Sequence, residues 1–348
     1  MTGLLWLALS GAASAETLRL ATWNVDLARQ GPGLLVEDLL GARPDPQVQA
    51  VIAGIVALDA DVLLLTGIDH DARQVALTAL ADRLAAAGAP YPFRFTAPPN
   101  AGHPTGLDLD RNGKLGQPRD AMGYGAFRGQ GGMALLSRLP LGPATDYTGF
   151  LWADLPGHLM PADTPAPERA GQRLSSVNHW QVPVQLPGGG QLAVLAFAAT
   201  PPVFDGPEDR NGRRNHDEAA FWLRLMEGAL PFPAPRPPLV LMGDANLDSA
   251  DGDGRPQALR ALLSGPALQD PAPRGSHGRS EAAHQGDPAL DTAFYAKGVG
   301  GLRVDYVLPS AGLRVSGAGV LWPADGALAE TLAQASRHRP VWVDVTLP

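Results

Sequence analysis

Short apolar runs, each bounded by Gly, Pro, Asp or Asn, recur along the whole chain. Apolar runs of this kind between turn-forming residues are typical of buried β-strands. They predict strands at residues 18–25, 61–66, 132–137, 179–185, 192–197, 238–242, 303–309 and 341–345.

Three other stretches have the character of helices. Residues 48–58 place apolar side chains at helical spacing, and residues 72–87 are rich in Ala and Leu and end before Gly88. A third helix is predicted to begin at Asn215, because Glu218 follows three positions later in the spacing of a capping box.

Composition narrows the class of protein. The 348 residues include 45% hydrophobic and 18% charged residues, as in a globular chain with a sizeable core. The 41 Gly and 34 Pro predict long surface loops, placed by their distribution at residues 97–132, 154–172 and 265–300. Because strands outnumber helices over the whole length, we expect one domain with two sheets at residues 16–348.

Charge and cysteine content exclude some functions. The formal net charge of -8 repels a phosphate backbone, which argues against non-specific duplex binding and favours a smaller substrate. The sequence has no Cys, so disulfides and thiolate metal sites are excluded.

The N-terminus resembles a signal peptide. An apolar stretch is followed by Ala13-Ser14-Ala15, a small-x-small pattern before a cleavage site, although no Lys or Arg precedes it. Residues 1–15 are therefore interpreted as a signal peptide, and we expect a periplasmic or secreted protein. No later apolar stretch has the length of a membrane span.

Polar residues suited to one kind of chemistry lie within four of the predicted strands or next to their ends. Open α/β sheets bind ligands just beyond their strand ends, so these residues are candidates for a common site. They are Asn24 and Asp26 in TWNVD, Asp244 and Asn246 in GDAN, Asp305 in RVDY, and His338 in SRH. Each alone is weak evidence, since an Asp at a strand end is commonly a turn former.

The series TWNVD, DVLLLTGID, GMALLSRLPL, GDAN, RVDYVL and SRHRPVWV resembles the endonuclease/exonuclease/phosphatase family of metal-dependent phosphoesterases, which includes DNase I-like nucleases. The resemblance implies a four-layer α/β sandwich, in which two packed mixed β-sheets are flanked by helices. It implies Asp244 as base or water orienter, Asn24 and Asn246 as ligands of phosphate and metal-bound oxygens, Asp305 as partner of His338, and Asp26 near a Mg²⁺ or Mn²⁺ ion.

Three positions depart from the family pattern. Gly67 stands where the resemblance implies the chief metal-binding Glu, Ala198 where it implies a His or Tyr, and Arg337 where it implies an Asp. Gly and Ala can neither ligate a cation nor transfer a proton, and general acid–base participation is commonly worth about 10²–10⁴-fold in rate. Two compensations are considered: Asp69 (or Asp71) reaching the metal, and Arg337 binding a phosphate directly. The alternative for the two Asp residues is a solvated loop charge.

Two further motifs carry charge. Asp108, Asp110 and Asn112, followed by Gly113, match the first half of a calcium loop, although the twelfth position is Arg119; the alternative is a plain turn. Arg210, Arg213 and Arg214 precede the predicted helix at Asn215, and Arg213 and Arg214 are candidates for substrate phosphate. The alternative is pairing with the acids around them, Asp205, Glu208, Asp209 and Asp217.

The sequence thus supports an exported, metal-dependent phosphoesterase acting on a small phosphoester or nucleic-acid fragment. The rival is a catalytically inactive member that binds a phosphorylated ligand or a protein partner. A third reading is a structural, calcium-dependent surface protein. The sequence does not indicate which protein partner would bind.

Overall fold

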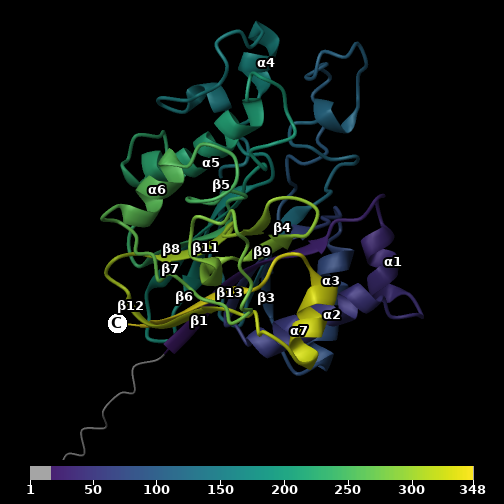
Figure 1. Ribbon diagram of the computed structural model, residues 1–348, viewed down its shortest axis with the longest axis vertical. Coiled ribbons are helices and arrows are strands. Elements are labelled where there is room, and N and C mark those ends of the chain that lie inside the picture. Colours follow the sequence, from purple (N-terminus) through teal and green to yellow (C-terminus); the bar gives the residue numbers. More distant parts are fainter. Residues whose placement is uncertain (1–16, 348) are drawn as a thin grey trace, which may run out of the picture.

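Two mixed β-sheets packed face to face form the centre of the molecule (Figure 1). The computed structural model describes residues 17–347, so the predicted signal peptide lies outside the described residues. The six-stranded sheet has the order β12 (Arg314–Val320), β13 (Val341–Thr346), β1 (Thr17–Leu27), β2 (Val62–Ile68), β4 (Gly132–Ser137), β3 (Phe93–Phe95). The five-stranded sheet has the order β11 (Asp305–Pro309), β8 (Leu239–Asp244), β7 (Gln191–Ala198), β6 (His179–Gln185), β5 (Thr145–Asp146).

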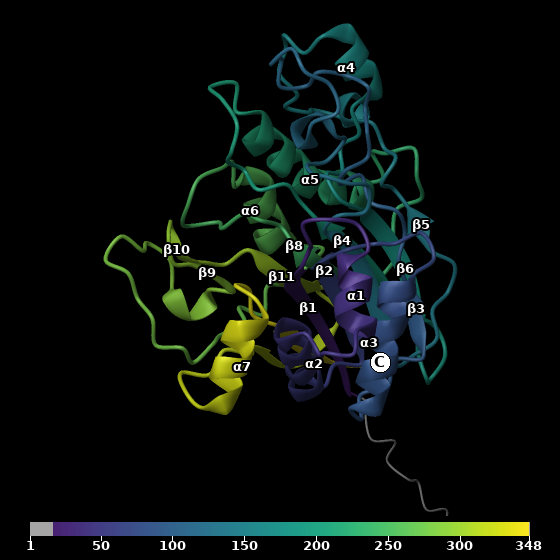
Figure 2. The same cartoon turned by 90° about the vertical axis from the view of Figure 1, so that its right-hand side faces the viewer.

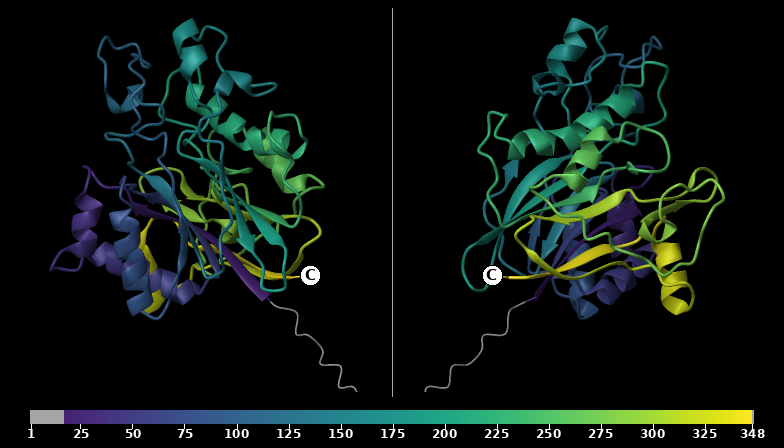
Figure 3. Two further views of the ribbon diagram at one scale, coloured as in Figure 1. Left: turned by 180° about the vertical axis from the view of Figure 1, so that it is seen from behind. Right: turned by 60° about the vertical axis from the view of Figure 1, so that its left-hand side comes forward.

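Helices cover the outer face of each sheet (Figures 2 and 3). The six-stranded sheet is covered by α1 (Leu34–Leu40), α2 (Pro46–Leu58), α3 (Val75–Ala86) and α7 (Ala327–Ala335). The five-stranded sheet is covered by α5 (Arg210–Met226) and α6 (Gln257–Ser264). The predicted four-layer α/β sandwich with two mixed sheets is confirmed.

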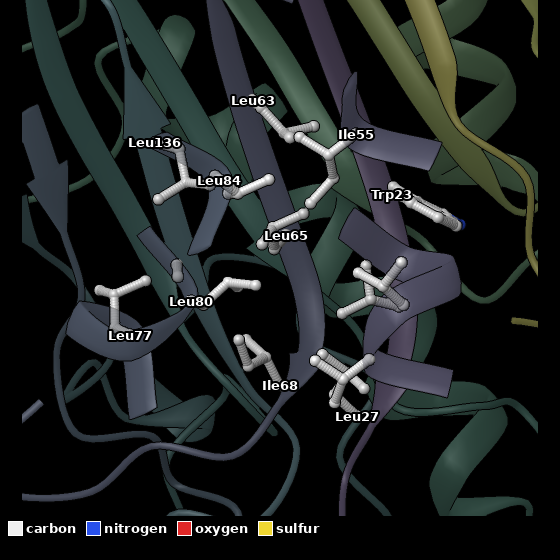
Figure 4. Close-up of a cluster of buried hydrophobic side chains, with 14 of the residues drawn as sticks. Trp23, Leu27, Ile55, Leu63, Leu65, Ile68, Leu77, Leu80, Leu84 and Leu136 are labelled. Atoms are coloured by element: carbon white, nitrogen blue, oxygen red, sulfur yellow. The ribbon is translucent and has the colours of Figure 1, made fainter. Parts of the chain in front are cut away.

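Strands with apolar side chains on both faces explain the four layers. Along β2, Leu63 and Leu65 point to the helices and belong to the cluster in Figure 4, whereas Val62 and Leu64 lie between the sheets. Successive side chains on a strand face opposite ways, so a strand between two apolar layers reads as a continuous apolar run. This is why the central strands were predictable from the sequence.

The smaller elements lie outside the two sheets. The strands β9 (Ala293–Tyr295) and β10 (Gly300–Leu302) form a separate two-stranded ribbon. The loop segments around α4 (Ala166–Gly171) and the short 3₁₀ helices Pro118–Asp120 and Trp152–Asp154 extend beyond α5 at one end of the molecule (Figure 1). A further 3₁₀ turn is formed by Pro288–Leu290.

The helix predicted to start at Asn215 starts five residues earlier, so the capping-box prediction is wrong. Asn215 lies inside α5 and its amide donates to the carbonyl oxygens of Thr200 and Ala245. Glu218 is also buried within the helix, where its carboxylate accepts hydrogen bonds from Ser176 and the Thr200 N–H. Tertiary hydrogen bonds to loops at the sheet edge therefore use the residues that local spacing assigned to a cap.

Within residues 17–347, no helix combines the length and the apolar character that a bilayer-spanning segment requires.

Gly54 provides a test of the packing between α2 and the six-stranded sheet. A Cβ at this position would lie 2.6 Å from Cη2 of the buried Trp23 and 3.1 Å from Cδ2 of Leu332. Gly54→Ala would raise intrinsic helix propensity by about 1 kcal/mol, but overpacking a core typically costs about 1–3 kcal/mol. We expect Gly54→Ala to lower the melting temperature, measured by thermal denaturation. Gly171→Ala in α4, where a Cβ meets nothing within 4 Å, is the matched control and should leave it unchanged.

Candidate active site

A hydrogen bond between side chains of the two sheets marks the centre of the site. Asn24 on β1 donates from Nδ2 to Oδ2 of Asp244, the last residue of β8, at 2.8 Å. The other oxygen of Asp244 accepts the backbone N–H of Asn246 at 2.8 Å, and the Asn246 amide donates to the carbonyl of Ala199. The sequence-predicted trio Asn24, Asp244 and Asn246 is therefore assembled at one edge of the sandwich.

Strand register places a second carboxylate beside the first. Asp305, the first residue of β11, is the antiparallel partner of Asp244, while Ala198 at the end of β7 is its parallel partner on the other side. His338 precedes β13 and donates from Nδ1 to Oδ2 of Asp305 at 2.8 Å. Thr292 donates its hydroxyl to the same Asp305 oxygen at 2.8 Å. The structure thus brings together all five residues predicted as catalytic.

Burial and nearby charges shift the pKa values of Asp244 and His338. Burial, together with the charge of Asp305, raises the pKa of Asp244 to about 7. Burial lowers the pKa of His338, but the charge and hydrogen bond of Asp305 and the charge of Asp244 outweigh it and raise that pKa to about 9. Near neutral pH the imidazole is therefore a cation, and Asp244 exchanges its proton in the same range.

A cavity of about 970 Å³ opens above this edge. Asn24, Asp244 and Asn246 line it, whereas Asp305 and His338 are buried behind them and do not. The ring nitrogen Nε2 of His338 lies 3.3 Å from the hydroxyl of Tyr295 on β9. Asp244 is therefore the ionisable member of the group that a ligand in the cavity can contact.

Asp26 does not provide the metal ligand that the resemblance implies. Its Oδ1 accepts Nη2 of Arg337 at 2.7 Å, and its Oδ2 accepts Nε and the backbone N–H of Arg337, both at 3.0 Å. The Ser336 hydroxyl also contacts Oδ2, at 3.2 Å. Burial raises the pKa of Asp26, but Arg337 and His338 outweigh it and hold that pKa below its ordinary value. The guanidinium of Arg337 is thus the cation at this carboxylate, and its predicted role in binding phosphate would require leaving Asp26.

Gly67, which stands where the resemblance implies a metal-binding Glu, has no ligand atom, and the space beside it is already filled. Gly67 has φ +66°, and a Cβ there would lie 2.2 Å from Oδ1 of Asn24. That oxygen is held in place because it accepts the backbone N–H of Asp26 at 3.1 Å. The donor set beside Asp26 and Gly67 therefore does not fit a divalent metal.

Asp69 does not take the place of the metal-binding Glu that the resemblance implies at position 67. Its two oxygens accept the backbone N–H groups of Arg29 and Gly131, each at 2.9 Å, so the carboxylate ties the loop after β2 to the segment before β4. Asp69 is not among the residues that line the cavity. Asp71 instead accepts the backbone N–H groups of Arg73, Val75 and Ala76, which explains why α3 starts at Val75 and not at residue 72.

The calcium half-motif closes on itself by hydrogen bonds. Asp108 accepts the N–H groups of Asn112 and Gly113 at 3.1 and 2.8 Å, and the Asn112 amide donates to Asp110 at 2.9 Å. Asp120 adds a third carboxylate within 4.8 Å of those of Asp108 and Asp110, although both its oxygens accept backbone N–H groups. These contacts are those of an Asx-rich turn, and calcium binding stays a prediction.

By sequence, Arg213 and Arg214 are either phosphate ligands or partners of nearby acids, and their hydrogen bonds match neither prediction. Arg213 donates to the carbonyl oxygens of Glu208 and Leu159 and does not line the cavity. Arg214 lines it but is buried, and donates to the carbonyl oxygens of Arg173, Leu174 and Ser175. Both guanidinium groups hold loops in place, so the structure does not present them to a phosphate. Arg210 also lines the cavity, with its guanidinium 3.7 Å from Glu168.

Two residues in contact with the site were missed in the sequence. Thr292 orients Asp305, and Tyr295 contacts His338; burial, with the charges of Asp244 and Asp305, raises the pKa of the Tyr295 phenol. Both come from the segment DTAFY in a region predicted as loop. A hydroxyl residue in a loop has no spacing signal, so only the fold could identify them.

Comparison with known proteins agrees with this geometry. The model of the Endonuclease/Exonuclease/phosphatase family matches residues 21–338. Among solved structures, the chain is similar to an endonuclease/exonuclease/phosphatase from Beutenbergia cavernae DSM 12333, with 20% identity, a TM-score of 0.56, and coverage of 95% of this chain and 72% of that one. A family protein from Leptotrichia buccalis C-1013-b is also similar, with 13% identity, a TM-score of 0.54, and coverage of 95% of this chain and 100% of that one. The endonuclease/exonuclease/phosphatase from Bacteroides vulgatus has 14% identity, a TM-score of 0.53, and coverage of 96% of this chain and 100% of that one. No curated protein matches the chain in sequence. At these identities the structural likeness shows the fold.

Gly67→Glu tests whether a metal site is lost only through its ligand. Because the new side chain would meet Asn24 Oδ1, we expect it to break the Asn24–Asp244 contact and lower the melting temperature without creating a tight Mg²⁺ or Mn²⁺ site. Calorimetric titration and thermal denaturation measure both effects. Gly189→Glu is the matched control, since Gly189 also has positive φ (+91°) but a Cβ there meets nothing within 4 Å. Micromolar binding of either ion by Gly67→Glu would contradict this expectation.

Proposed function

The chain belongs to the endonuclease/exonuclease/phosphatase family, and we propose that it hydrolyses a small phosphoric ester held in the cavity above Asp244. Family and fold support a phosphoesterase-type or nuclease-type hydrolase. The observation that carries the proposal is a buried carboxylate with a pKa of about 7 that lines the cavity and is fixed by Asn24 and Asn246. A general base is most effective when its pKa lies near the working pH.

In the proposed reaction Asp244 accepts a proton from water as the water oxygen bonds to phosphorus. The bond from phosphorus to the ester oxygen breaks, and the leaving oxygen takes a proton from solvent. Negative charge grows on the phosphoryl oxygens, and the buried imidazolium of His338, fixed by Asp305, provides a nearby positive charge without reorganisation. Asn24 holds Asp244 in the orientation that this proton transfer requires.

The family generally depends on a divalent metal, and the donor set beside Asp26 does not fit one. We therefore infer that the imidazolium of His338, held by Asp305, supplies the positive charge near the phosphoryl oxygens, since Arg337 is engaged by Asp26. This inference replaces the Mg²⁺ or Mn²⁺ dependence expected from the sequence.

The cavity favours a small substrate. Its volume lies at the upper end of ordinary ligand pockets, and the two most exposed aromatic side chains among the described residues, Tyr124 and Phe204, line it. Aromatic faces of this kind bind a nucleobase or another flat group by stacking. The cavity lining is acidic on balance, which agrees with the expectation that long nucleic acids bind poorly. It contains the acids Asp110, Asp163, Glu168, Asp205, Glu208 and Asp244 and the arginines Arg111, Arg119, Arg210 and Arg214.

A second candidate function is binding of a phosphorylated ligand without hydrolysis. The observations that favour it are Gly67 packed against Asn24, Ala198 in register with Asp244, and the closed Asp26–Arg337 pair. All three remove groups that could contact a phosphate at the cavity. This candidate predicts binding of a phosphomonoester with no turnover.

Export is also part of the proposal. It is supported by the apolar stretch and the Ala13-Ser14-Ala15 pattern at the N-terminus. Expression of the full chain in a Gram-negative host, followed by N-terminal sequencing of the periplasmic fraction, tests it; a periplasmic product that begins near residue 16 is the expected outcome.

Hydrolysis of bis(p-nitrophenyl) phosphate, with and without a chelator, tests the proposed activity. We expect turnover that the chelator leaves intact, and a loss of about 10²–10⁴-fold in kcat/KM for Asp244→Asn. Asp253→Asn, the same change at an exposed residue nearby, is the control and should retain activity. Loss of activity in the presence of the chelator would show that hydrolysis requires a metal ion and would contradict the proposed metal-independent reaction. No turnover, with calorimetric binding of p-nitrophenyl phosphate, would select the second candidate.

The proton affinities also predict a pH profile. Asp244 must be deprotonated to accept a proton, so kcat/KM should rise with pH through about 7. His338 must be protonated to provide positive charge, so kcat/KM should fall as pH rises through about 9. The measurement is kcat/KM from pH 5 to 10, and a profile flat below pH 7 would show that Asp244 is not the base.

A further inference from the structure

A second group of ionisable side chains lies in the long loop between α6 and β9. Glu281, His284 and Asp291 each provide one ligand atom, and the three atoms lie within 4.8 Å of one another. The loop belongs to the segment predicted from sequence as featureless surface, and none of its residues lines the cavity above Asp244. The group is therefore separate from the candidate active site.

Two carboxylate oxygens in this group are buried without a partner. Asp291 is 1% exposed, and its Oδ2 has no hydrogen-bond donor; Oε2 of Glu281 is likewise buried and unpaired. A buried polar atom left without a partner is costly, and buried carboxylates are normally paired or bound to a metal. A cation bound between these acids would satisfy both oxygens.

The backbone opposite is built to make room for both carboxylates. A Cβ on Gly301 would lie 2.0 Å from Oδ2 of Asp291, and a Cβ on Gly300, which has φ +81°, would lie 3.2 Å from Cδ of Glu281. The two consecutive glycines begin β10, so the strand passes the acids at a distance that no other residue type allows. The two acids are thus accommodated side by side against one strand end.

The histidine between them is oriented as a metal-bound imidazole would be. Nδ1 of His284 lies 3.3 Å from Oδ2 of Asp251, whose carboxylate also accepts the N–H groups of Gln285 and Gly286. Nε2 of His284 faces Oδ1 of Asp291 at 3.1 Å. A metal-ligating His usually donates its other ring N–H to a carboxylate or a backbone carbonyl, and Nδ1 of His284 lies 3.3 Å from the carbonyl oxygen of Gly286, its hydrogen-bond partner, beside Asp251.

We propose that Glu281, His284 and Asp291 bind one divalent transition-metal ion, Zn²⁺ or Mn²⁺, with the Gly286 carbonyl and the neighbouring Asp251 orienting the imidazole. One imidazole with two carboxylates suits these ions better than Mg²⁺ or Ca²⁺, which take all-oxygen ligand sets. The ion neutralises three neighbouring carboxylates that otherwise face a single histidine. Three protein ligands leave the remaining coordination positions to water.

The ion would fix the segment that contains Thr292, next to Asp305 and His338. Asp291 is followed by Thr292, whose hydroxyl holds Asp305 and whose carbonyl accepts the N–H of Arg339. Glu281 and Asp291 lie ten positions apart, so one ion closes the intervening loop onto β10. Its role is structural and does not depend on hydrolysis at Asp244.

Metal titration into the chelator-stripped, dialysed full chain tests the proposal. ZnCl₂, MnCl₂, MgCl₂ and CaCl₂ are added separately, and calorimetry and thermal denaturation are recorded. We expect one Zn²⁺ or Mn²⁺ per chain, a melting temperature raised by several degrees, and weaker binding of Mg²⁺ and Ca²⁺. Co²⁺ as a probe should give visible absorption that the His284→Gln variant lacks.

Asp291→Asn separates ligation from folding. An Asn amide can donate to Nε2 of His284, so the stripped variant should melt no lower than stripped wild type, yet bind Zn²⁺ at least about 100-fold more weakly. His216→Gln removes another carboxylate-paired histidine, 2.9 Å from Asp217, and should leave metal binding unchanged. Asp244→Asn should also retain it, which assigns the ion to this site and not to the active site.

Two outcomes would overturn the proposal. One is the absence of stoichiometric binding by any of the four ions, which would make the group an ion pair between protonated His284 and its acids. The other is Zn²⁺ binding that persists in both Asp291→Asn and His284→Gln, which would place the ion elsewhere.

Discussion

Two carboxylates forced to face each other across neighbouring strands are the constraint on which the site depends. Asp244 and Asp305 are register partners in β8 and β11, and both are buried. Their repulsion is reduced in two ways: His338 and Thr292 donate to Asp305, and Asn24 donates to Asp244 across the gap between the sheets. Each donor comes from a different part of the chain, so the raised pKa of Asp244 exists only when the whole sandwich is assembled.

The region beside Asp26 shows how a family site can be rebuilt without a change of fold. A guanidinium is planar and binds a carboxylate through two parallel hydrogen bonds, which fixes direction as well as charge. Arg337 does this to Asp26 while its backbone N–H binds the same carboxylate. Asn24 fills the space next to Gly67 and takes the Asp26 N–H. The residues at positions 67 and 337 are therefore mutually consistent, because Asn24, Asp26 and Arg337 each have a partner within the group.

The central strands and the residues of the site could be predicted from the sequence better than the hydrogen-bond and ion-pair partners of the charged side chains. Apolar runs reveal strands buried on both faces, which is why β2, β4, β7 and β8 are predictable, whereas β12, with the sequence RVSGAGV and mixed burial, is not. The positions of Asn24, Asp244, Asn246, Asp305 and His338 followed from strand ends and a family pattern.

What the sequence could not provide was the partner of each charge. Arg337 and Arg214 are candidates for phosphate by sequence, but Arg337 binds Asp26 and Arg214 binds carbonyl groups. Asp69 is a candidate metal ligand by sequence, but it binds two backbone N–H groups. Long side chains choose among partners within several ångströms, and that choice depends on tertiary packing.

The pairing of β1 with β13 has a consequence for how the chain acquires its structure. Arg19 and Asp344 form an ion pair although they are 325 positions apart, and Thr17 is the register partner of Thr346. The six-stranded sheet therefore stays divided between β12 and β1 until β13 has been synthesised. A chain stalled short of β13 would expose two strand edges that are prone to aggregate, whereas linking Thr17 to Thr346 and cutting a distant loop should be tolerated as a circular permutation.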